Sequence, residues 1–418
     1  MKRKTCTKLL GLLLALLLLA GCAGPAASPE TQGAQTTAAP ISTEAPPQDT
    51  NAPESSAPEA AKYAADYALL WDTLEQDYPY LDYLRGKGID VDDIRARYET
   101  KMKEAATSED MAVIVESIFR ELQNTAHLYL VSQEDFPFFY EIYTNDEAAL
   151  TFRRAWNETM RQAAEAGYYS LPGADEPQQP DMYENLPPVK VSYYQDCKVL
   201  CLSILTFLRD IDMDRDVLKN ALEKYPEAEH LVFDISLNSG GDDRYWRENL
   251  VAPFGEDYLF PLRMYCKDSP RNRQILEDMG GCRRTEELED APAWAKELGL
   301  ELFLQEDSTV EGRPELHSDA KRWLLVGPNV YSAAEMFADF CKATGWATVA
   351  GTHTAGDGIG FDPVLTLLPD SGLLFRFSMV AGEAAGGGMS LEGTEPDLVL
   401  PGAGISHLLD YLRKQCKD

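Results

Sequence analysis

Short, uninterrupted apolar runs recur along the second half of the chain, separated by segments with helical spacing. Strands with one face in water alternate apolar and polar residues, whereas continuous apolar runs are typical of parallel strands covered on both faces. Strands that alternate with helices in this way predict crossover units and an α/β core. We assign residues 186–418 to this core. The expected strands are residues 199–207, 231–237, 323–326, 347–350, 365–368 and 373–380.

Residues 61–185 have a different pattern, in which apolar side chains recur every three or four positions. This spacing places the apolar side chains on one face of a helix. Thr107 and Asp110 have the spacing of a capping box at the start of an expected helix at residues 108–123. The pattern therefore predicts a mostly helical N-terminal domain. Its expected helices are residues 63–74, 91–105 and 108–123.

The first 21 residues have the features of an export signal. A basic start is followed by an apolar run at residues 9–20, which is too short to span a bilayer comfortably. The run ends in Leu-Ala-Gly-Cys, which is similar to a bacterial lipobox, and this resemblance makes Cys22 the lipid-attachment residue. Residues 22–60 are rich in Pro, Ala, Ser and Thr and predict a disordered tether. We therefore expect a lipid-anchored protein on the outer face of the cell membrane. An ordinary secretory signal with a chance cysteine is the alternative.

The formal net charge of the chain is −31. Binding to nucleic acid depends on clustered cations that neutralise phosphates. We therefore expect no nucleic-acid partner, and contact with the membrane only through the lipid anchor.

Six cysteines remain once Cys6 leaves with the signal and Cys22 carries lipid. An even number permits disulfides outside the cytoplasm, although the pairing cannot be read from sequence. Buried free thiols are the alternative. The spacings fit no zinc pattern, and we expect no metal site. The six are Cys197, Cys201, Cys266, Cys282, Cys341 and Cys416.

Two segments at the ends of expected strands carry residues suited to catalysis. The segment from Asp234 to Gly241 lies at the end of a buried strand, and its paired glycines, Gly240 and Gly241, can adopt positive φ and let backbone amides point at a ligand. Ser332 lies in a Tyr-Ser-Ala-Ala-Glu segment where another strand gives way to a helix. A hydroxyl at the positive end of a helix suits a nucleophile whose attack creates an oxyanion. The alternatives are a plain turn at the glycines and a helix cap in which Ser332 pairs with Glu335.

Two further residues are candidates for proton transfer. His127 closes the segment Glu-Leu-Gln-Asn-Thr-Ala-His, and a neutral imidazole is a suitable base near pH 7. Glu392 begins the segment Glu-Gly-Thr-Glu-Pro-Asp, and a carboxylate of this kind can orient an imidazole. A structural histidine and a solvated surface charge are the alternatives. Besides a lysine, the other candidate bases are His230, His317, His353 and His407.

Taken in order, these segments resemble the C-terminal processing peptidases, also called tail-specific proteases, and especially their tricorn-core relatives. A helical region with a histidine is followed by Asn-x-Gly-Gly, Tyr-Ser-Ala-Ala-Glu, Gly-Thr-His-Thr-Ala-Gly and Glu-Gly-x-x-Pro-Asp. The resemblance is good over residues 190–402 and looser over residues 63–130. It implies a ClpP/crotonase-like core behind the helical N-terminal domain, and serine peptidase chemistry.

The resemblance also implies a role for each candidate residue. Ser332 corresponds to the nucleophile, His127 to the base of the tricorn type and Glu392 to the carboxylate that orients the base. The oxyanion hole corresponds to the backbone N–H of Ala333 and that of Gly240 or Gly241.

Two positions depart from the family pattern. Asp357 stands where the enzymes with a Ser-Lys dyad carry lysine, and a carboxylate cannot replace that amine, so His127 becomes necessary. Ala126 stands where the tricorn type has a serine that bridges to the glutamate. Glu392 then reaches His127 directly or through water, or the enzyme is impaired. His353 is a rival base. Since no segment between His127 and Val189 resembles the PDZ domain of many processing proteases, we do not expect tail-specific cleavage.

The sequence thus predicts a surface-anchored serine-type peptidase that acts on peptide or protein substrates and needs no cofactor. Two alternatives stay open. One is a non-catalytic relative that binds peptide or cell-wall material. The other is a solute-binding lipoprotein, which the signal and tether fit equally well.

Overall fold

The computed structural model describes residues 61–145, 153–171, 186–209 and 211–415. The expected signal peptide at residues 1–21, the lipid site Cys22, the tether at residues 22–60 and the domain boundary expected at residue 185 lie outside these residues. No helix within the described ranges is long and apolar enough to cross a bilayer.

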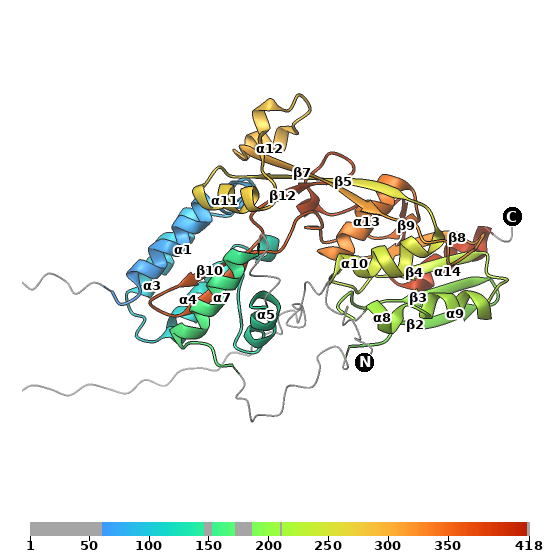
Figure 1. Ribbon diagram of the computed structural model, residues 1–418, viewed down its shortest axis with the longest axis horizontal. Coiled ribbons are helices and arrows are strands. Elements are labelled where there is room, and N and C mark those ends of the chain that lie inside the picture. The colour runs from blue at the N-terminus through green and yellow to red at the C-terminus, as the bar shows by residue number, and fades with distance from the viewer. Residues whose placement is uncertain (1–60, 146–152, 172–185, 210, 416–418) are drawn as a thin grey trace, which may run out of the picture.

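The N-terminal region is mostly helical, as predicted (Figure 1). Helix α4 (Ser108–Glu121) begins with the expected capping box, in which Thr107 Oγ1 accepts from the N–H of Asp110. In return, the carboxylate of Asp110 accepts from the N–H of Thr107 at 2.9 Å. The other elements of this region are α1 (Ala64–Gln76), α2 (Leu81–Gly86), α3 (Val91–Met102), the 3₁₀ turn η1 (Thr125–His127), β1 (Tyr129–Leu130), α5 (Phe136–Tyr143) and α7 (Arg154–Ala166).

The C-terminal core is built on a six-stranded sheet with the strand order β13-β9-β8-β4-β3-β2. Neighbouring strands are parallel except at one edge, where β2 runs antiparallel to β3. This sheet confirms the predicted α/β core. Its strands are β2 (Lys190–Tyr194), β3 (Val199–Ser203), β4 (His230–Asp234), β8 (Lys321–Val326), β9 (Thr348–Gly351) and β13 (Leu398–Val399).

Both faces of this sheet are covered, which explains the continuous apolar runs. In β8, Leu324 belongs to the hydrophobic cluster that includes α13 (Ala333–Thr344). The next residue, Leu325, belongs to the cluster on the opposite face, which includes α14 (Ile405–Gln415). The remaining helical elements of the core are α8 (Ile211–Asp214), α9 (Val217–Lys224), α10 (Asp243–Trp246), η2 (Arg247–Val251), η3 (Ala252–Phe254) and η5 (Ser390–Glu392).

An antiparallel sheet that the sequence did not predict extends from the core, along the top of Figure 1. Its long strands β5 (Tyr258–Cys266) and β7 (Leu302–Val310) pair over their whole lengths. Pro261 lies inside the first run and Glu306 inside the second, and both residue types weaken a strand signal. The smaller elements of this part are β6 (Arg283–Arg284), β12 (Ala381–Glu383), α11 (Pro270–Asp278), η4 (Thr285–Glu287) and α12 (Ala293–Glu297).

The last two predicted strands form, but they leave the core sheet. β10 (Val364–Leu368) and β11 (Leu373–Phe377) pair with each other, and β11 also pairs with β1 of the N-terminal region. Helix α7 lies beside β10 (Figure 1). Just beyond β11, the N–H of Ser378 donates to the carbonyl of Ala126 at 2.8 Å. These bonds hold the segment around His127 against residues 373–378, which come after Ser332 in the chain.

The five cysteines that the structure describes form no disulfide with one another, and four of them are buried. Burial raises the pKa of Cys201 to about 12, which keeps that thiol protonated and unreactive. The sixth cysteine, Cys416, lies outside the described residues. Among the described residues, the reading as free thiols is therefore the one that the structure supports.

Candidate active site

Ser332 occupies the turn between β8 and α13 in a conformation that non-glycine residues rarely adopt. Its φ is 54° and its ψ is −128°. A positive φ in a residue with a side chain is strained, and such strain persists where the surrounding structure requires it, often at functional sites. A sharp, strained strand-to-helix turn is also how hydrolases present a nucleophilic serine. The backbone alone therefore marks Ser332 as a candidate nucleophile.

The helix-cap alternative for Ser332 is wrong. Its side chain makes no capping hydrogen bond to α13. Glu335, the other half of the supposed capping box, points into the protein. Its carboxylate accepts from Thr394 Oγ1 at 2.6 Å and from the N–H of Gly356 at 3.4 Å. The hydroxyl of Ser332 is left available for chemistry.

The same contacts hold the strained turn in place. The N–H of Ser332 donates to the carbonyl of Gly356 at 3.2 Å, and the N–H of Ala355 donates to the carbonyl of Val330 at 2.8 Å. The buried carboxyl of Glu335 ties this neighbouring segment to Thr394. Burial raises the pKa of Glu335 to about 7, so the network holds a carboxyl that titrates near neutrality. The chain around the nucleophile is thus fixed from two sides.

The sequence predicted an oxyanion hole made by the backbone N–H of Ala333 and that of Gly240 or Gly241. In the described part of the chain, the N–H groups of Ala333 and Gly241 have no hydrogen-bond acceptor. The N–H of Gly240 donates to Asn238 Oδ1 at 2.8 Å and is therefore already engaged. Of the two glycines that the sequence left open, Gly241 is the one with a free donor. Ala333 and Gly241 are therefore the donors available to a substrate oxygen.

Close packing explains why both glycines are needed. A Cβ on Gly240 would lie 3.0 Å from the Cβ of Ser332, so the glycine brings the end of β4 directly against the nucleophile. A Cβ on Gly241 would lie 2.3 Å from the carbonyl carbon of Phe207. Both residues also have positive φ, at 115° and 139°. Neither position accepts a side chain without movement of the backbone.

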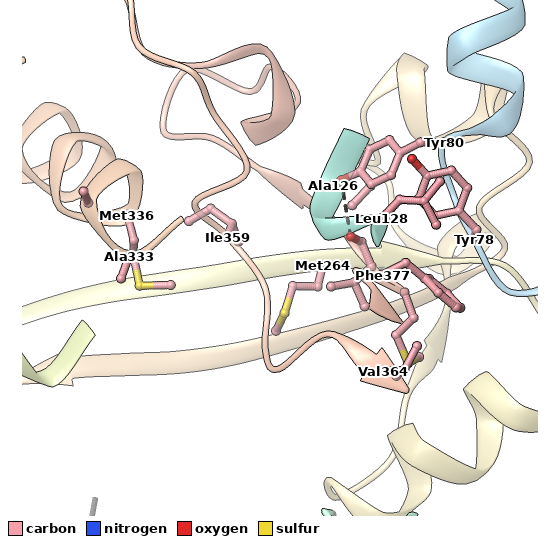
Figure 2. Packing of buried hydrophobic residues seen from close by; sticks show 14 of the residues in the cluster. Tyr78, Tyr80, Ala126, Leu128, Met264, Ala333, Met336, Ile359, Val364 and Phe377 are labelled. Carbon is pink, nitrogen blue, oxygen red and sulfur yellow. Dashed lines mark hydrogen bonds between the residues drawn. The ribbon is translucent and has the colours of Figure 1, made fainter. Parts of the chain in front are cut away.

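His127 lies on a strained segment that is firmly packed. Its own φ is 58°, and that of Ala126 is 54°. Figure 2 shows that Ala126 and Leu128, on either side of it, lie beside Tyr78 and other aromatic side chains. The carbonyl of Thr125 accepts from the Tyr78 hydroxyl at 2.8 Å. These contacts on both sides of His127 hold its strained backbone in place.

Burial sets the protonation state of His127. The residue is 9% exposed, and desolvation together with the positive charge of Arg376 lowers its pKa to about 3. Its imidazole is therefore neutral at physiological pH, and burial and Arg376 both oppose its protonation. The ring lies against that of Tyr331, with centroids 4.9 Å apart, and the backbone N–H of His127 donates to the Tyr331 hydroxyl at 3.2 Å.

The structure brings His127 and Ser332 into the same neighbourhood without bonding them. Tyr331, which contacts His127, is the residue immediately before Ser332. No hydrogen bond joins the serine hydroxyl to the imidazole among the described residues. Catalytic hydrogen bonds are often loose before substrate binds and tighten in the complex. Within the described residues, His127 and Ser332 are thus connected only through Tyr331, which contacts the one and precedes the other in the chain.

The carboxylate beside His127 is Asp357 rather than the expected Glu392. Asp357 Oδ2 lies 3.5 Å from Nε2 of His127. Glu392 instead lies 3.2 Å from Nζ of Lys87 and accepts from the Tyr83 hydroxyl at 3.4 Å, with about half of its side chain exposed. The role that the resemblance implied for Glu392 has no contact to support it in the described part of the chain. In the structure, Glu392 is instead a half-exposed surface charge, which was the alternative interpretation.

The rival base His353 makes no hydrogen bond or ion pair with Ser332, His127 or Asp357 within the described residues; its partners are Thr354 and Glu395. Its Nδ1 lies 2.9 Å from the carbonyl oxygen of Thr354, and its Nε2 lies 4.0 Å from a carboxylate oxygen of Glu395. Half of its side chain is exposed. Among the described residues, no group of three or more His, Cys, Asp or Glu side chains has the arrangement of a metal site.

Sequence reasoning missed two members of this site. Asp357 was noted only as a departure from the family's lysine, and Tyr331 only as part of a motif. Tyr331 donates its hydroxyl to Asp357 Oδ2 at 2.8 Å, which links the residue before the nucleophile to the partner of the base. The position of Asp357 at the family's lysine site was the one signal that placed it near Ser332.

Comparison with known proteins relates the C-terminal core to peptidases. Residues 198–400 match the model of peptidase family S41. No curated protein gives a significant match to the chain.

Two solved structures have a similar fold. A candidate peptidase from Parabacteroides merdae ATCC 43184 has a TM-score of 0.54 and 18% identity, over 85% of this chain and 97% of its own. Mature CPAF complexed with lactacystin has a TM-score of 0.52 and 14% identity, over 85% of this chain and 98% of its own. The whole arrangement, a helical N-terminal region before an α/β core, is therefore shared with these proteins.

Proposed function

Because residues 198–400 form a domain of peptidase family S41, a family of serine peptidases, we propose that Ser332 is the nucleophile and His127 the general base of a peptide-bond hydrolase. The observation that carries this proposal is the strained backbone of Ser332, with an uncapped hydroxyl beside the free N–H groups of Ala333 and Gly241.

The reaction follows from the chemistry of these groups. Ser332 Oγ attacks the carbonyl carbon of the scissile amide while His127 takes the hydroxyl proton. The N–H groups of Ala333 and Gly241 stabilise the oxyanion that forms. His127 then gives its proton to the departing amine, which leaves an acyl group on Ser332. A water molecule, deprotonated by His127, releases the acid and restores the hydroxyl.

Labelling tests the assignment of the nucleophile. A fluorophosphonate probe phosphonylates serines that an adjacent base activates, and we expect peptide mass spectrometry to locate the label on Ser332. The serines at 236 and 378, which lie at nearby loops of the fold, serve as internal controls and are expected to stay unlabelled. Labelling of another serine, with Ser332 unmodified in folded protein, overturns the assignment.

A non-catalytic relative that binds peptide is the second candidate. The observation in its favour is the absence of a hydrogen bond between Ser332 and His127 in the described residues. In that case the probe leaves every serine unlabelled, and the chain binds peptides without hydrolysing them. The strained backbone and uncapped hydroxyl of Ser332 favour the catalytic proposal, because peptide binding alone does not require them.

We also propose that the mature protein is anchored at the cell surface through lipid on Cys22. The basic start, the short apolar run and the Leu-Ala-Gly-Cys ending of the first 22 residues support this. Mass spectrometry of the mature protein is expected to find an N-terminal peptide that begins at Cys22 and carries acyl chains. An unmodified N-terminus at any other residue contradicts the anchor and favours an ordinary secretory signal.

A further inference from the structure

We propose that Asp357 is the residue that positions His127, the role that the family pattern would give to Glu392. This inference rests on the proposed function, because it concerns how the base of the reaction is held. Asp357 touches no substrate in the scheme above, so we describe it as a positioning residue and not as a catalytic one.

Contacts place Asp357 between the base and the nucleophile's neighbour. Among the described residues, its carboxylate is the only one within ion-pair distance of His127, at 3.5 Å from Nε2. The same oxygen accepts from the hydroxyl of Tyr331 at 2.8 Å and from that of Ser378 at 3.4 Å. Two neutral donors thus fix the carboxylate and leave it able to accept from a third, the imidazole N–H.

The backbone supports the same assignment independently. Seven described residues other than glycine have positive φ, and six of them are Asp357, Ser332, His127 and the three neighbours of His127 at 123, 124 and 126. Strained residues gather at functional sites because the strain must be held by the surroundings. Asp357, at a φ of 57°, is held by its N–H, which donates to the carbonyl of Ser390 at 2.8 Å. The strain singles out Asp357 together with the nucleophile and the base.

The negative charge of Asp357 can stabilise a protonated His127. When His127 takes a proton from Ser332, an imidazolium forms in a buried site that already lies near the positive charge of Arg376. Both desolvation and Arg376 oppose that charge, and a carboxylate against Nε2 offsets them. A neutral imidazole that carries its hydrogen on Nε2 also has its lone pair on Nδ1, which becomes the atom that receives the proton of Ser332.

Burial gives Asp357 a measurable titration. Desolvation raises its pKa to about 6, against the hydrogen bonds from Tyr331 and Ser378, which lower it. We therefore expect kcat/KM to fall as the pH decreases through about 6, because protonation of Asp357 removes the charge that supports the imidazolium. Among the described residues, the other titratable groups near Asp357 or His127 are Tyr78, Tyr80, Tyr129, Tyr331 and Arg376.

Asp357→Asn tests this role in the full-length protein. Asparagine tolerates a positive φ and keeps an acceptor for Tyr331, so the change removes the charge with little disturbance of the backbone. Using a peptide substrate cleaved by the wild type, we expect kcat to fall about 100-fold with KM little changed, and the loss of activity near pH 6 to disappear. If Asp357 had only a structural role, the fall of kcat/KM below about pH 6, the acidic limb of the pH profile, would remain in the variant.

Two matched variants complete the experiment. Asp339→Asn changes another buried aspartate with a pKa of about 6, which accepts from the N–H of Ala385, and we expect kcat/KM to stay within about threefold of the wild type. Glu392→Gln tests the competing carboxylate, and we expect an equally small effect. If Glu392→Gln lowers kcat more than Asp357→Asn does, or if the limb near pH 6 persists in Asp357→Asn, the inference is wrong.

Nitrogen NMR of the wild-type imidazole adds a measurement that needs no variant. We expect the neutral ring of His127 to carry its proton on Nε2, and a proton on Nδ1 overturns the inference even if Asp357→Asn fails to fold. These outcomes differ from failure of the proposed function, which would be the absence of any turnover that depends on Ser332. In that case the positioning role falls with the function.

Discussion

Ser332→Ala is expected to lower kcat/KM by about 10⁴- to 10⁶-fold, the largest activity loss that a single substitution in this chain should produce. In the proposed mechanism, the variant removes the one atom that forms a bond to substrate and leaves the N–H groups of Ala333 and Gly241 in place. These donors and the binding of substrate account for whatever rate remains. Initial rates on a fluorogenic peptide cleaved by the wild type give the measurement.

The same variant is expected to leave stability nearly unchanged. The hydroxyl of Ser332 makes no side-chain hydrogen bond within the described ranges, so its removal strands no buried partner. The free energy of unfolding should therefore stay within about 1 kcal/mol of the wild type. Denaturant unfolding of the two proteins checks this. Activity above one tenth of the wild type, in a variant with normal stability, would contradict the assignment of the nucleophile.

Local sequence predicted the elements that carry the nucleophile. The run that became β8 is apolar because both sides of the strand are buried, and the helix stripe after Ser332 packs on one of those sides. Strand burial and helix periodicity are local properties, so a single sequence reveals them. Even the glycines at 240 and 241 were recognisable, since a glycine pair at the end of a buried strand allows positive φ, which both residues have.

Contacts between distant segments were beyond that kind of reasoning. β11 pairs with β1 across more than two hundred residues, and this pairing brings Ala126 against Ser378. Nothing in the local pattern of residues 373–377 distinguishes a partner in the N-terminal region from one in the core sheet. The pairing nevertheless decides which carboxylate faces His127. The family pattern pointed to Glu392, whereas the long-range packing places Asp357 there.

His127→Asn is expected to lower kcat/KM by about 10⁴-fold or more, because the proposed mechanism then lacks the group that takes the proton of Ser332. Asparagine suits the positive φ at this position and has no basic nitrogen. Thermal unfolding separates this effect from the lost packing against Tyr331. His353→Asn is the matched control, since His353 is the rival base and is half exposed. If His353→Asn inactivates the protein and His127→Asn does not, the base has been assigned wrongly.

Combining the two changes tests whether the residues act as one unit. If the only catalytic work of His127 is done on the hydroxyl of Ser332, removing the base has no further effect once the hydroxyl is gone. We therefore expect the double variant Ser332→Ala with His127→Asn to retain the same residual rate as Ser332→Ala alone, as groups in one catalytic unit do. Losses that multiply would mean that His127 acts elsewhere, for example in binding. Equal residual rates would instead establish that the two groups meet during the reaction, although no hydrogen bond joins them in the described residues.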